Sequence, residues 1–143
     1  MVWIHGGGFI SGDGTPDSFG PQYWMVHGVI IVTVNYRLGP LGYLSLGLED
    51  IPGNMGQLDQ VMALTWVQDN IQMFGGDPSL VTIFGQSAGA AAVTYHMFRE
   101  VSQISISRSR DRKIFLNIQN MKCNRMQILG HPSARGAGDC SDE

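Results

Sequence analysis

Nine consecutive residues decide the fold of this chain: VTIFGQSAG, from Val81 to Gly89. The first four form an apolar run typical of a buried strand, and an alanine-rich stretch suited to a helix follows. Between them stands Gly-x-Ser-x-Gly, a pattern that lifts a serine hydroxyl out of a sheet as a nucleophile. The turn must be tight, so glycines flank it and Ser87 is expected in a strained backbone conformation. We predict a strand–turn–helix unit, although a serine that only begins a helix gives the same pattern by chance.

A second glycine-rich motif, HGGGF, spans His5–Phe9 and closes another apolar run, Val2–Ile4. Three successive glycines can turn their backbone N–H groups toward one point, where the oxyanion of a transition state would develop. The alternative is a flexible loop that uses glycine only for turns. We expect the His5 side chain to be a structural hydrogen-bonding group rather than a base.

The order and spacing of these motifs resemble the type-B carboxylesterase and cholinesterase family of α/β-hydrolases, most of all insect carboxylesterases of the juvenile-hormone-esterase kind. Further landmarks of that family follow without a gap: Asn35–Gly42, Pro52–Gly56, Asp59-Gln60, Trp66-Val67 and Phe74–Pro78. The resemblance covers residues 1–98. It implies an α/β class and a partial α/β-hydrolase fold, a parallel sheet with flanking helices, whose N-terminal and C-terminal portions are missing. Met1 is then expected to be an internal methionine or a gene-model start.

The resemblance also implies roles for residues beside the nucleophile. The backbone N–H groups of Gly7, Gly8 and Ala88 are the implied oxyanion donors. Gln86 stands where the family commonly has Glu, and a neutral amide lacks the negative potential that would favour cationic substrates. The alternative for Gln86 is a simple polar filler.

Two charged residues look like the family's interior ion pair, Arg37 and Asp77. Arg37 is the only basic residue among the first 98, which suits a partnered site. The alternative is a solvated arginine, whose ion pairs would contribute little.

The composition of the chain excludes several other classes of protein. It has 143 residues, 43% hydrophobic and 15% charged, with a formal net charge of −3, which describes one globular domain without a nucleic-acid surface. The sequence has no run of eighteen apolar residues, so we predict no membrane span. We also expect no signal peptide in the residues given, because Met1 is followed at once by a predicted strand. Relatives of this family are often secreted, so the compartment stays unknown. We find no metal cluster and no cofactor motif, and the implied partner is a small-molecule ester.

The chain changes character near Phe98. Residues 1–98 carry one basic residue against seven acids, whereas residues 99–143 carry eight basic residues against five acids. We therefore predict a partial carboxylesterase domain over 1–98 and a non-family tail over 99–143. The tail is interpreted as disordered or aberrant: an alternative exon, a retained intron or a gene-model error. A basic nucleic-acid arm is disfavoured because its charges are mixed with apolar residues.

Periodicity predicts further elements. We expect a helix over Pro21–His27, a strand over Val29–Val34, a long connection over Tyr36–Gly53, a helix over Met55–Phe74 ended by Gly75 or Gly76, and a helix over Ser87–His96. In the long helix, Leu58, Val61, Met62, Thr65, Trp66 and Asp69 follow the 3.6-residue rhythm of an amphipathic face. The three tryptophans, Trp3, Trp24 and Trp66, are expected at core positions.

The rest of a catalytic triad is not recognisable. His96 lies on the helix that Ser87 begins, roughly 13 Å along its axis, and cannot reach the hydroxyl. His131, with Glu100 or Asp111 before it, has the right order, but no strand–loop context places these residues. We therefore expect a carboxylic-ester hydrolase fragment that is inactive alone. The alternatives are a non-catalytic adhesion member resembling neuroligin or glutactin, and a truncated product that does not fold stably.

Overall fold

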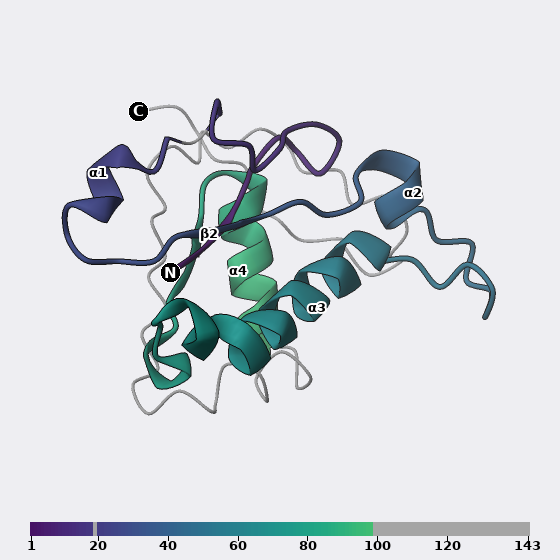
Figure 1. The fold of residues 1–143 in the computed structure, drawn as a ribbon. Helices are drawn as coiled ribbons and strands as arrows, with labels where there is room; N and C mark the ends of the chain where they lie inside the picture. Colours follow the sequence, from purple (N-terminus) through teal and green to yellow (C-terminus); the bar gives the residue numbers. More distant parts are fainter. Residues whose placement is uncertain (19, 99–143) are drawn as a thin grey trace, which may run out of the picture.

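The structure, a computed structural model, describes residues 1–18 and 20–98 (Figure 1). In chain order its elements are β1 (Val2–Ile4), α1 (Gln22–Met25), β2 (Val32–Val34), α2 (Gly39–Tyr43), α3 (Met55–Asn70), the 3₁₀ turns η1 (Ile71–Phe74) and η2 (Pro78–Leu80), β3 (Ile83–Gly85) and α4 (Ala88–Phe98). Residues 99–143 lie outside this description. So do the predicted tail, His131, Glu100 and Asp111.

The three strands form one parallel sheet in the order β2-β1-β3. Val2 of β1 pairs with Val32 on one side and with Ile83 on the other. Parallel strands need crossover connections, and here those connections carry the helices. The chain is therefore of the α/β class, as the sequence predicts.

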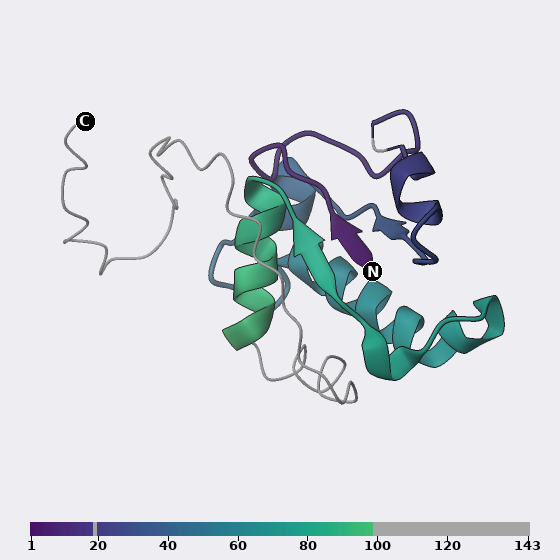
Figure 2. The same cartoon turned by 90° about the vertical axis from the view of Figure 1, so that its left-hand side faces the viewer.

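Helices α3 and α4 pack against one face of the sheet (Figure 2). The core on this face consists of alternate strand residues and of apolar helix residues: Val2, Ile4, Val34, Ile83, Leu64, Val67, Ile71, Ala92 and Val93. Strand side chains alternate between faces, so Trp3 and Phe84 point to the opposite face. There the Phe84 ring lies 5.0 Å from that of Trp3 and 5.5 Å from that of Trp24, between centroids. Trp24 of α1 thus covers part of this second face, as parallel sheets favour cover on both faces.

Several element boundaries differ from the predicted ones. The strand expected over Val29–Val34 forms only as β2, and the helix expected over Met55–Phe74 divides into α3 and η1. Gly75 ends η1 with a left-handed φ of 81°, as predicted. The connection expected over residues 36–53 contains the short helix α2, which begins at a Gly-Pro pair.

The buried face of α3 is a correction to the predicted one. The structure buries Gly56, Gln57, Gln60, Val61, Leu64 and Val67, so only Val61 is shared with the expected stripe. Met62 is 72% exposed and Trp66 is 47% exposed, which contradicts the core position expected for Trp66. The physical reason is that two glutamines face inward. Their amides find a hydrogen-bonding partner in the core, so the helix turns its Met62 side outward.

Candidate active site

Ser87 lies at the junction between β3 and α4, near the carboxyl edge of the sheet. Its backbone has a φ of 56°, the left-handed region that costs a non-glycine residue about 1–2 kcal/mol. The helix that follows is anchored here, because the N–H of Ala91 donates to the Ser87 carbonyl oxygen at 3.1 Å. The side chain is exposed. The strained backbone expected for this residue is present.

The two glycines that flank Ser87 have no room for a side chain. A Cβ on Gly85 would lie 2.5 Å from the carbonyl carbon of Gly89 and 2.7 Å from the carbonyl oxygen of Ile4. A Cβ on Gly89 would collide with that same Ile4 oxygen. All of these atoms belong to the backbone and cannot swing away, so the tight turn requires glycine at both positions.

The glycine-rich loop after β1 lies against this turn. A Cβ on Gly6 would lie 2.6 Å from the carbonyl oxygen of Gln86 and 3.1 Å from Cβ of Ser87. Gly7 and Gly8 both have positive φ, 107° and 63°, which glycine adopts without a steric penalty. The structure therefore brings the two sequence motifs together at the carboxyl ends of adjacent parallel strands.

Three backbone donors near the turn have no acceptor among the residues that the structure describes. Within residues 1–18 and 20–98, the N–H groups of Gly7, Gly8 and Ala88 donate no hydrogen bond. Gln86 is exposed beside them and brings a neutral amide to the same place. Unpaired N–H groups beside an exposed hydroxyl can stabilise negative charge that develops on a bound carbonyl oxygen.

The nearby histidine, His5, is a structural residue. Its side chain is 4% exposed, Nδ1 lies 2.7 Å from the Gly6 carbonyl oxygen, and its ring stacks on Tyr36 with centroids 4.4 Å apart. Since a carbonyl oxygen only accepts, Nδ1 is the protonated nitrogen. Sequence reasoning did not single out Tyr36. The feature of the sequence that could have indicated Tyr36 is its place as an aromatic residue two positions after a buried strand.

His96 lies on α4, is fully buried and faces α3. Its Nε2 lies 2.8 Å from Oε1 of Gln60 and 3.1 Å from Nε2 of Gln57. No hydrogen bond joins the Ser87 hydroxyl to a histidine in the part of the chain that the structure describes. His96 is therefore a core residue, and neither it nor His5 is hydrogen-bonded to Ser87.

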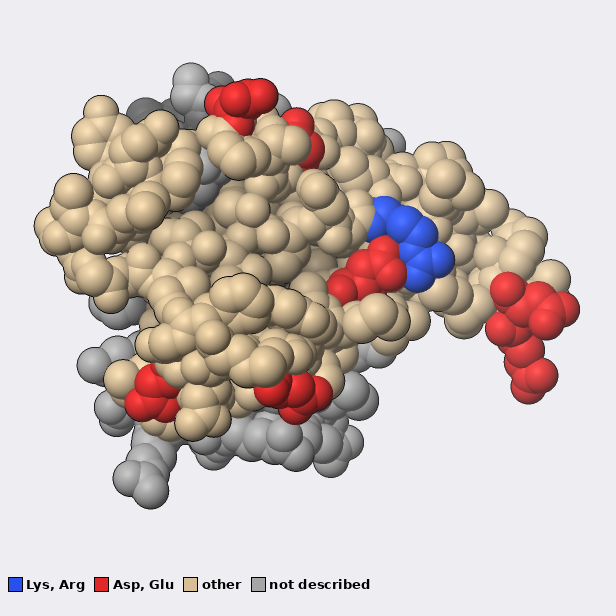
Figure 3. Space-filling model, viewed as in Figure 1, with Lys and Arg blue, Asp and Glu red and all other residues tan. Residues whose placement is uncertain are grey.

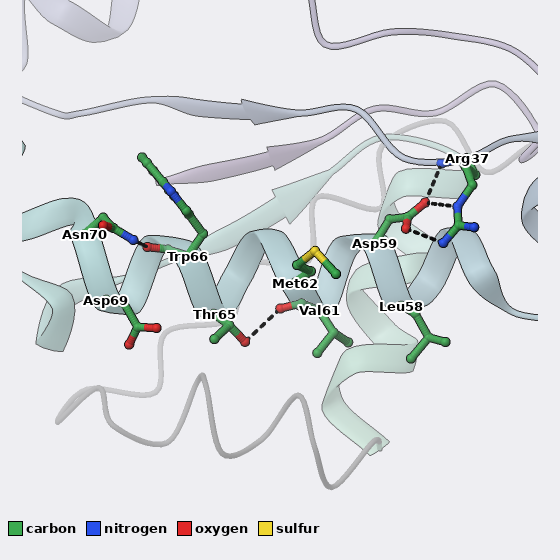
Figure 4. Close-up of a pocket in the computed structure, with 9 residues that line it drawn as sticks. All are labelled: Arg37, Leu58, Asp59, Val61, Met62, Thr65, Trp66, Asp69 and Asn70. Carbon is green, nitrogen blue, oxygen red and sulfur yellow. Dashed lines mark hydrogen bonds and ion pairs between the residues drawn. The ribbon is translucent and has the colours of Figure 1, made fainter.

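The ion pair of Arg37 is a correction to the sequence prediction. The guanidinium binds Asp59 rather than Asp77, through Nη2 at 2.7 Å and Nε at 2.8 Å, and the Arg37 backbone N–H also donates to this carboxylate at 3.0 Å (Figure 4). The Arg37 side chain is 52% exposed, so the pair is not interior. Asp77 instead accepts a hydrogen bond from the Ser79 backbone N–H at 2.8 Å.

These hydrogen bonds from Arg37 lower the pKa of Asp59. In Figure 3 the blue atoms belong to Arg37, the only Lys or Arg in the first 98 residues, and they lie beside red carboxylate atoms. Asp59 stands one helical turn into α3, so the pair fixes the segment after β2 to the start of this helix.

An open groove runs along the outer face of α3 (Figure 4). Its lining includes Arg37, Met62, Trp66 and Asp69, and none of its residues belongs to the Gly6–Gly8 loop or to the turn at Ser87. The groove is therefore separate from the candidate site.

Two other kinds of site are absent from the described residues. No group of three or more His, Cys, Asp or Glu side chains there could hold a metal ion. Across the same residues, each helix is too short or too polar to cross a membrane.

Comparisons with known proteins agree with this fold. The sequence model of the carboxylesterase family matches residues 1–114. Cholinesterase 1 of Branchiostoma lanceolatum is 53% identical over 110 residues, which are 76% of this chain and 31% of that protein. Juvenile hormone esterase of Tribolium castaneum is 53% identical over 103 residues, 72% of this chain and 18% of that protein.

A solved structure is similar as well. The crystal structure of juvenile hormone esterase from Manduca sexta, with OTFP covalently attached, matches with a TM-score of 0.71 at 47% identity, over 73% of this chain and 20% of that chain. The described residues thus form part of an α/β-hydrolase fold. The chain spans between about a fifth and a third of the length of the relatives named here.

Proposed function

The chain belongs to the carboxylesterase family, and from this premise we propose that Ser87 is the nucleophile of a carboxylic-ester hydrolase. One observation carries the proposal: Ser87 is exposed at a left-handed φ of 56°, against a loop of three glycines. A serine held at a strand–helix corner presents its hydroxyl above the sheet edge, where an ester can reach it.

The backbone N–H groups of Gly7, Gly8 and Ala88 form the oxyanion hole in this proposal. Their lack of an acceptor within the described residues supports the role, because a donor without a partner can still form a hydrogen bond to the oxyanion of the transition state. Losing one such donor typically lowers kcat by about a hundred- to a thousandfold.

The reaction proceeds in two halves. The Ser87 oxygen attacks the ester carbonyl carbon as a histidine base takes its proton, and the carbonyl π electrons move to the oxyanion. The oxyanion re-forms the carbonyl, the bond to the alcohol oxygen breaks, and the histidine returns the proton to that oxygen. Water then repeats the attack on the acyl group, which releases the acid and restores the serine.

The described residues supply no base for this sequence. His5 and His96 are buried and engaged in the contacts given above, and His27 is exposed on the loop after α1. Loss of triad members lowers kcat by on the order of 10⁴–10⁶. We therefore expect residues 1–143 alone to hydrolyse esters slowly. Phosphonylation of Ser87 needs the same removal of a proton, so it should be slow as well, but still faster than at serines without backbone N–H donors beside them.

A fluorophosphonate probe tests the proposal on the 143-residue chain. Phosphonylation of Ser87, located by peptide mass spectrometry, is the expected result. Ser87→Ala should abolish the label, whereas Ser18→Ala, which removes an exposed hydroxyl elsewhere, should leave it unchanged. A chain that melts cooperatively but is labelled no faster at Ser87 than at exposed serines such as Ser18 would contradict the proposal, and would favour a non-catalytic adhesion member of the same fold family.

A further inference from the structure

The glycine loop is held at both ends by the segment that follows β2. At its start, the hydroxyl of Tyr36 donates to the carbonyl oxygen of His5 at 2.8 Å. At its end, the backbone N–H of Gly39 donates to the carbonyl oxygen of Phe9 at 2.7 Å. Only glycines, Gly6–Gly8, lie between these two anchors.

The first anchor is buried and rigid. Tyr36 is 6% exposed and its ring stacks on the His5 ring at an angle of 20°. Registered pairing of β1 with β2 ends at Ile4 and Val34. The Tyr36 hydroxyl therefore continues the link between these two strands at the point where the loop leaves the sheet.

The same carbonyl also touches the helix that begins at the nucleophile. A Cβ on Gly89 would lie 2.8 Å from the His5 carbonyl oxygen, so this oxygen lies between Tyr36 and the first turn of α4. That turn contains Ala88, the third oxyanion donor of the proposed function. A shift of the His5 carbonyl would change the position of Gly7 and Gly8 relative to Ser87.

Loop geometry matters here because glycine has the largest backbone freedom of any residue. Oxyanion donors stabilise a transition state only when they are held in place beforehand, within about 3 Å of the future oxyanion. Gly6–Gly8 carry no side chains, so hydrogen bonds to the backbone hold the loop. The Gly7 carbonyl oxygen accepts from the N–H groups of Ile10 and Ser11, and the two end anchors fix this turn to the segment after β2.

We propose that Tyr36 is a positioning residue, which aims the N–H groups of Gly7 and Gly8 through its hydrogen bond to the His5 carbonyl. The role rests on the proposed function of these two amides. Tyr36 does not contact the ester in this scheme and transfers no proton. Burial raises the pKa of Tyr36 to about 12, so the hydroxyl keeps its proton at any pH used to assay an esterase.

The competing role for Tyr36 is that of a core residue, since its ring is part of the main hydrophobic cluster. Tyr36→Phe separates the two roles because it keeps the ring and removes only the hydroxyl. Tyr23→Phe is the matched control, because Tyr23 is 83% exposed on α1 and far from the loop in sequence.

Two measurements on the 143-residue chain distinguish a positioning role of Tyr36 from a purely structural one. The first is the second-order rate of Ser87 phosphonylation by a fluorophosphonate, which should fall about 3- to 10-fold in Tyr36→Phe, the effect of one hydrogen bond. The second is hydrogen–deuterium exchange of the peptide that contains Gly6–Gly8, which should become several-fold faster while exchange in α3 stays the same. Tyr23→Phe should match the wild type in both.

Each result bears on a different claim. Equal labelling and equal exchange in Tyr36→Phe and wild type would overturn the positioning role. If the wild type is not labelled at all, the proposed function fails, and exchange alone decides whether Tyr36 anchors the loop. If Tyr36→Phe does not melt cooperatively, 3-fluorotyrosine at position 36 replaces it. This side chain is a stronger donor, so it should slow loop exchange, and unchanged exchange would overturn the proposal.

Discussion

Gly89 lies directly against the carbonyl oxygen of Ile4, so α4 contacts the end of the central strand backbone to backbone. This contact joins three features of the candidate site: β1, the glycine loop that leaves it, and the helix that Ser87 begins. A helix can approach a strand this closely only where it carries no side chain.

Gly89→Ala should therefore destabilise the fold. In an ordinary helix interior alanine is favoured over glycine by about 1 kcal/mol. Here the added Cβ meets a backbone carbonyl that cannot rotate away, so we expect a net loss of about 2–4 kcal/mol in the free energy of unfolding, measured with urea. Gly28→Ala is the control, since Gly28 has a φ of 64° but nothing within 4 Å of an added Cβ. It should lose only about 1–2 kcal/mol from backbone strain. A Gly89→Ala chain as stable as the wild type would disprove this packing.

The backbone of Ser87 predicts a conflict between stability and reactivity. Glycine adopts a φ of 56° without the penalty that serine pays. Ser87→Gly should consequently be more stable than Ser87→Ala by about 1 kcal/mol, while both lose fluorophosphonate labelling. Thermal melting of the two variants side by side measures the difference. Equal stability would mean that position 87 is not strained.

Asp59 should stabilise the fold in a pH-dependent way. Hydrogen bonds from Arg37 lower the pKa of Asp59 in the folded state, so its contribution is present above its ordinary pKa of 3.8 and is lost as the pH falls through the lower folded value. Asp59→Asn should lower Tm by about 2–4 °C at pH 7, because the pair is largely exposed. At a pH below the folded pKa, the difference should disappear. A Tm difference that persists there would assign the effect to packing instead.

His96 should be important for stability although it is no base for Ser87. It is fully buried, and its removal would leave Oε1 of Gln60 without its partner and Nε2 of Gln57 with only the Ala92 carbonyl oxygen. We expect His96→Ala to lower the free energy of unfolding by about 2–4 kcal/mol, from the cavity and from the unsatisfied amides together. His27→Ala, at an exposed position, should change it by less than about 0.5 kcal/mol.

Gln86 should influence which probes react at Ser87. Its neutral amide is exposed beside the nucleophile. Gln86→Glu would add a negative charge there, so the rate of Ser87 phosphonylation by a cationic organophosphonate should rise by a few-fold relative to a neutral one. The ratio of the two rates controls for any general change in reactivity, and its salt dependence should follow screening of an exposed charge. An unchanged ratio would make Gln86 a simple polar filler.

The sequence predicted local features of this molecule better than its long-range contacts. The strand–turn–helix at Ser87 follows from nearby residues, since glycines on both sides and an apolar run before them leave few conformations. The buried face of α3 does not follow from nearby residues. Gln57 and Gln60 have the polarity of surface residues, and the side chain that bonds to them in the core, His96, lies far along the chain. A polar group can be buried only when its partner is buried with it, and a periodic pattern does not reveal that partner.

The predicted ion pair between Arg37 and Asp77 was wrong for a related reason. The family resemblance implied Asp77 as the partner, and composition only suited a paired arginine. Residues 1–98 contain seven acids, and neither composition nor spacing ranks them. The choice of Asp59 depends on how α3 begins beside the segment after β2. Tyr36 was missed because its hydroxyl bonds to the carbonyl oxygen of His5, which lies 31 residues earlier in the chain.

The strand order has a consequence for how this protein is made. β1 lies in the middle of the sheet, yet Val2 has its partners at Val32 and at Ile83. A ribosome releases the central strand first and its second neighbour only after most of this region has been synthesised. Contacts so distant along the chain form slowly, and until then the central strand is open to wrong partners. Slow elongation or a chaperone during synthesis should therefore raise the yield of folded chain.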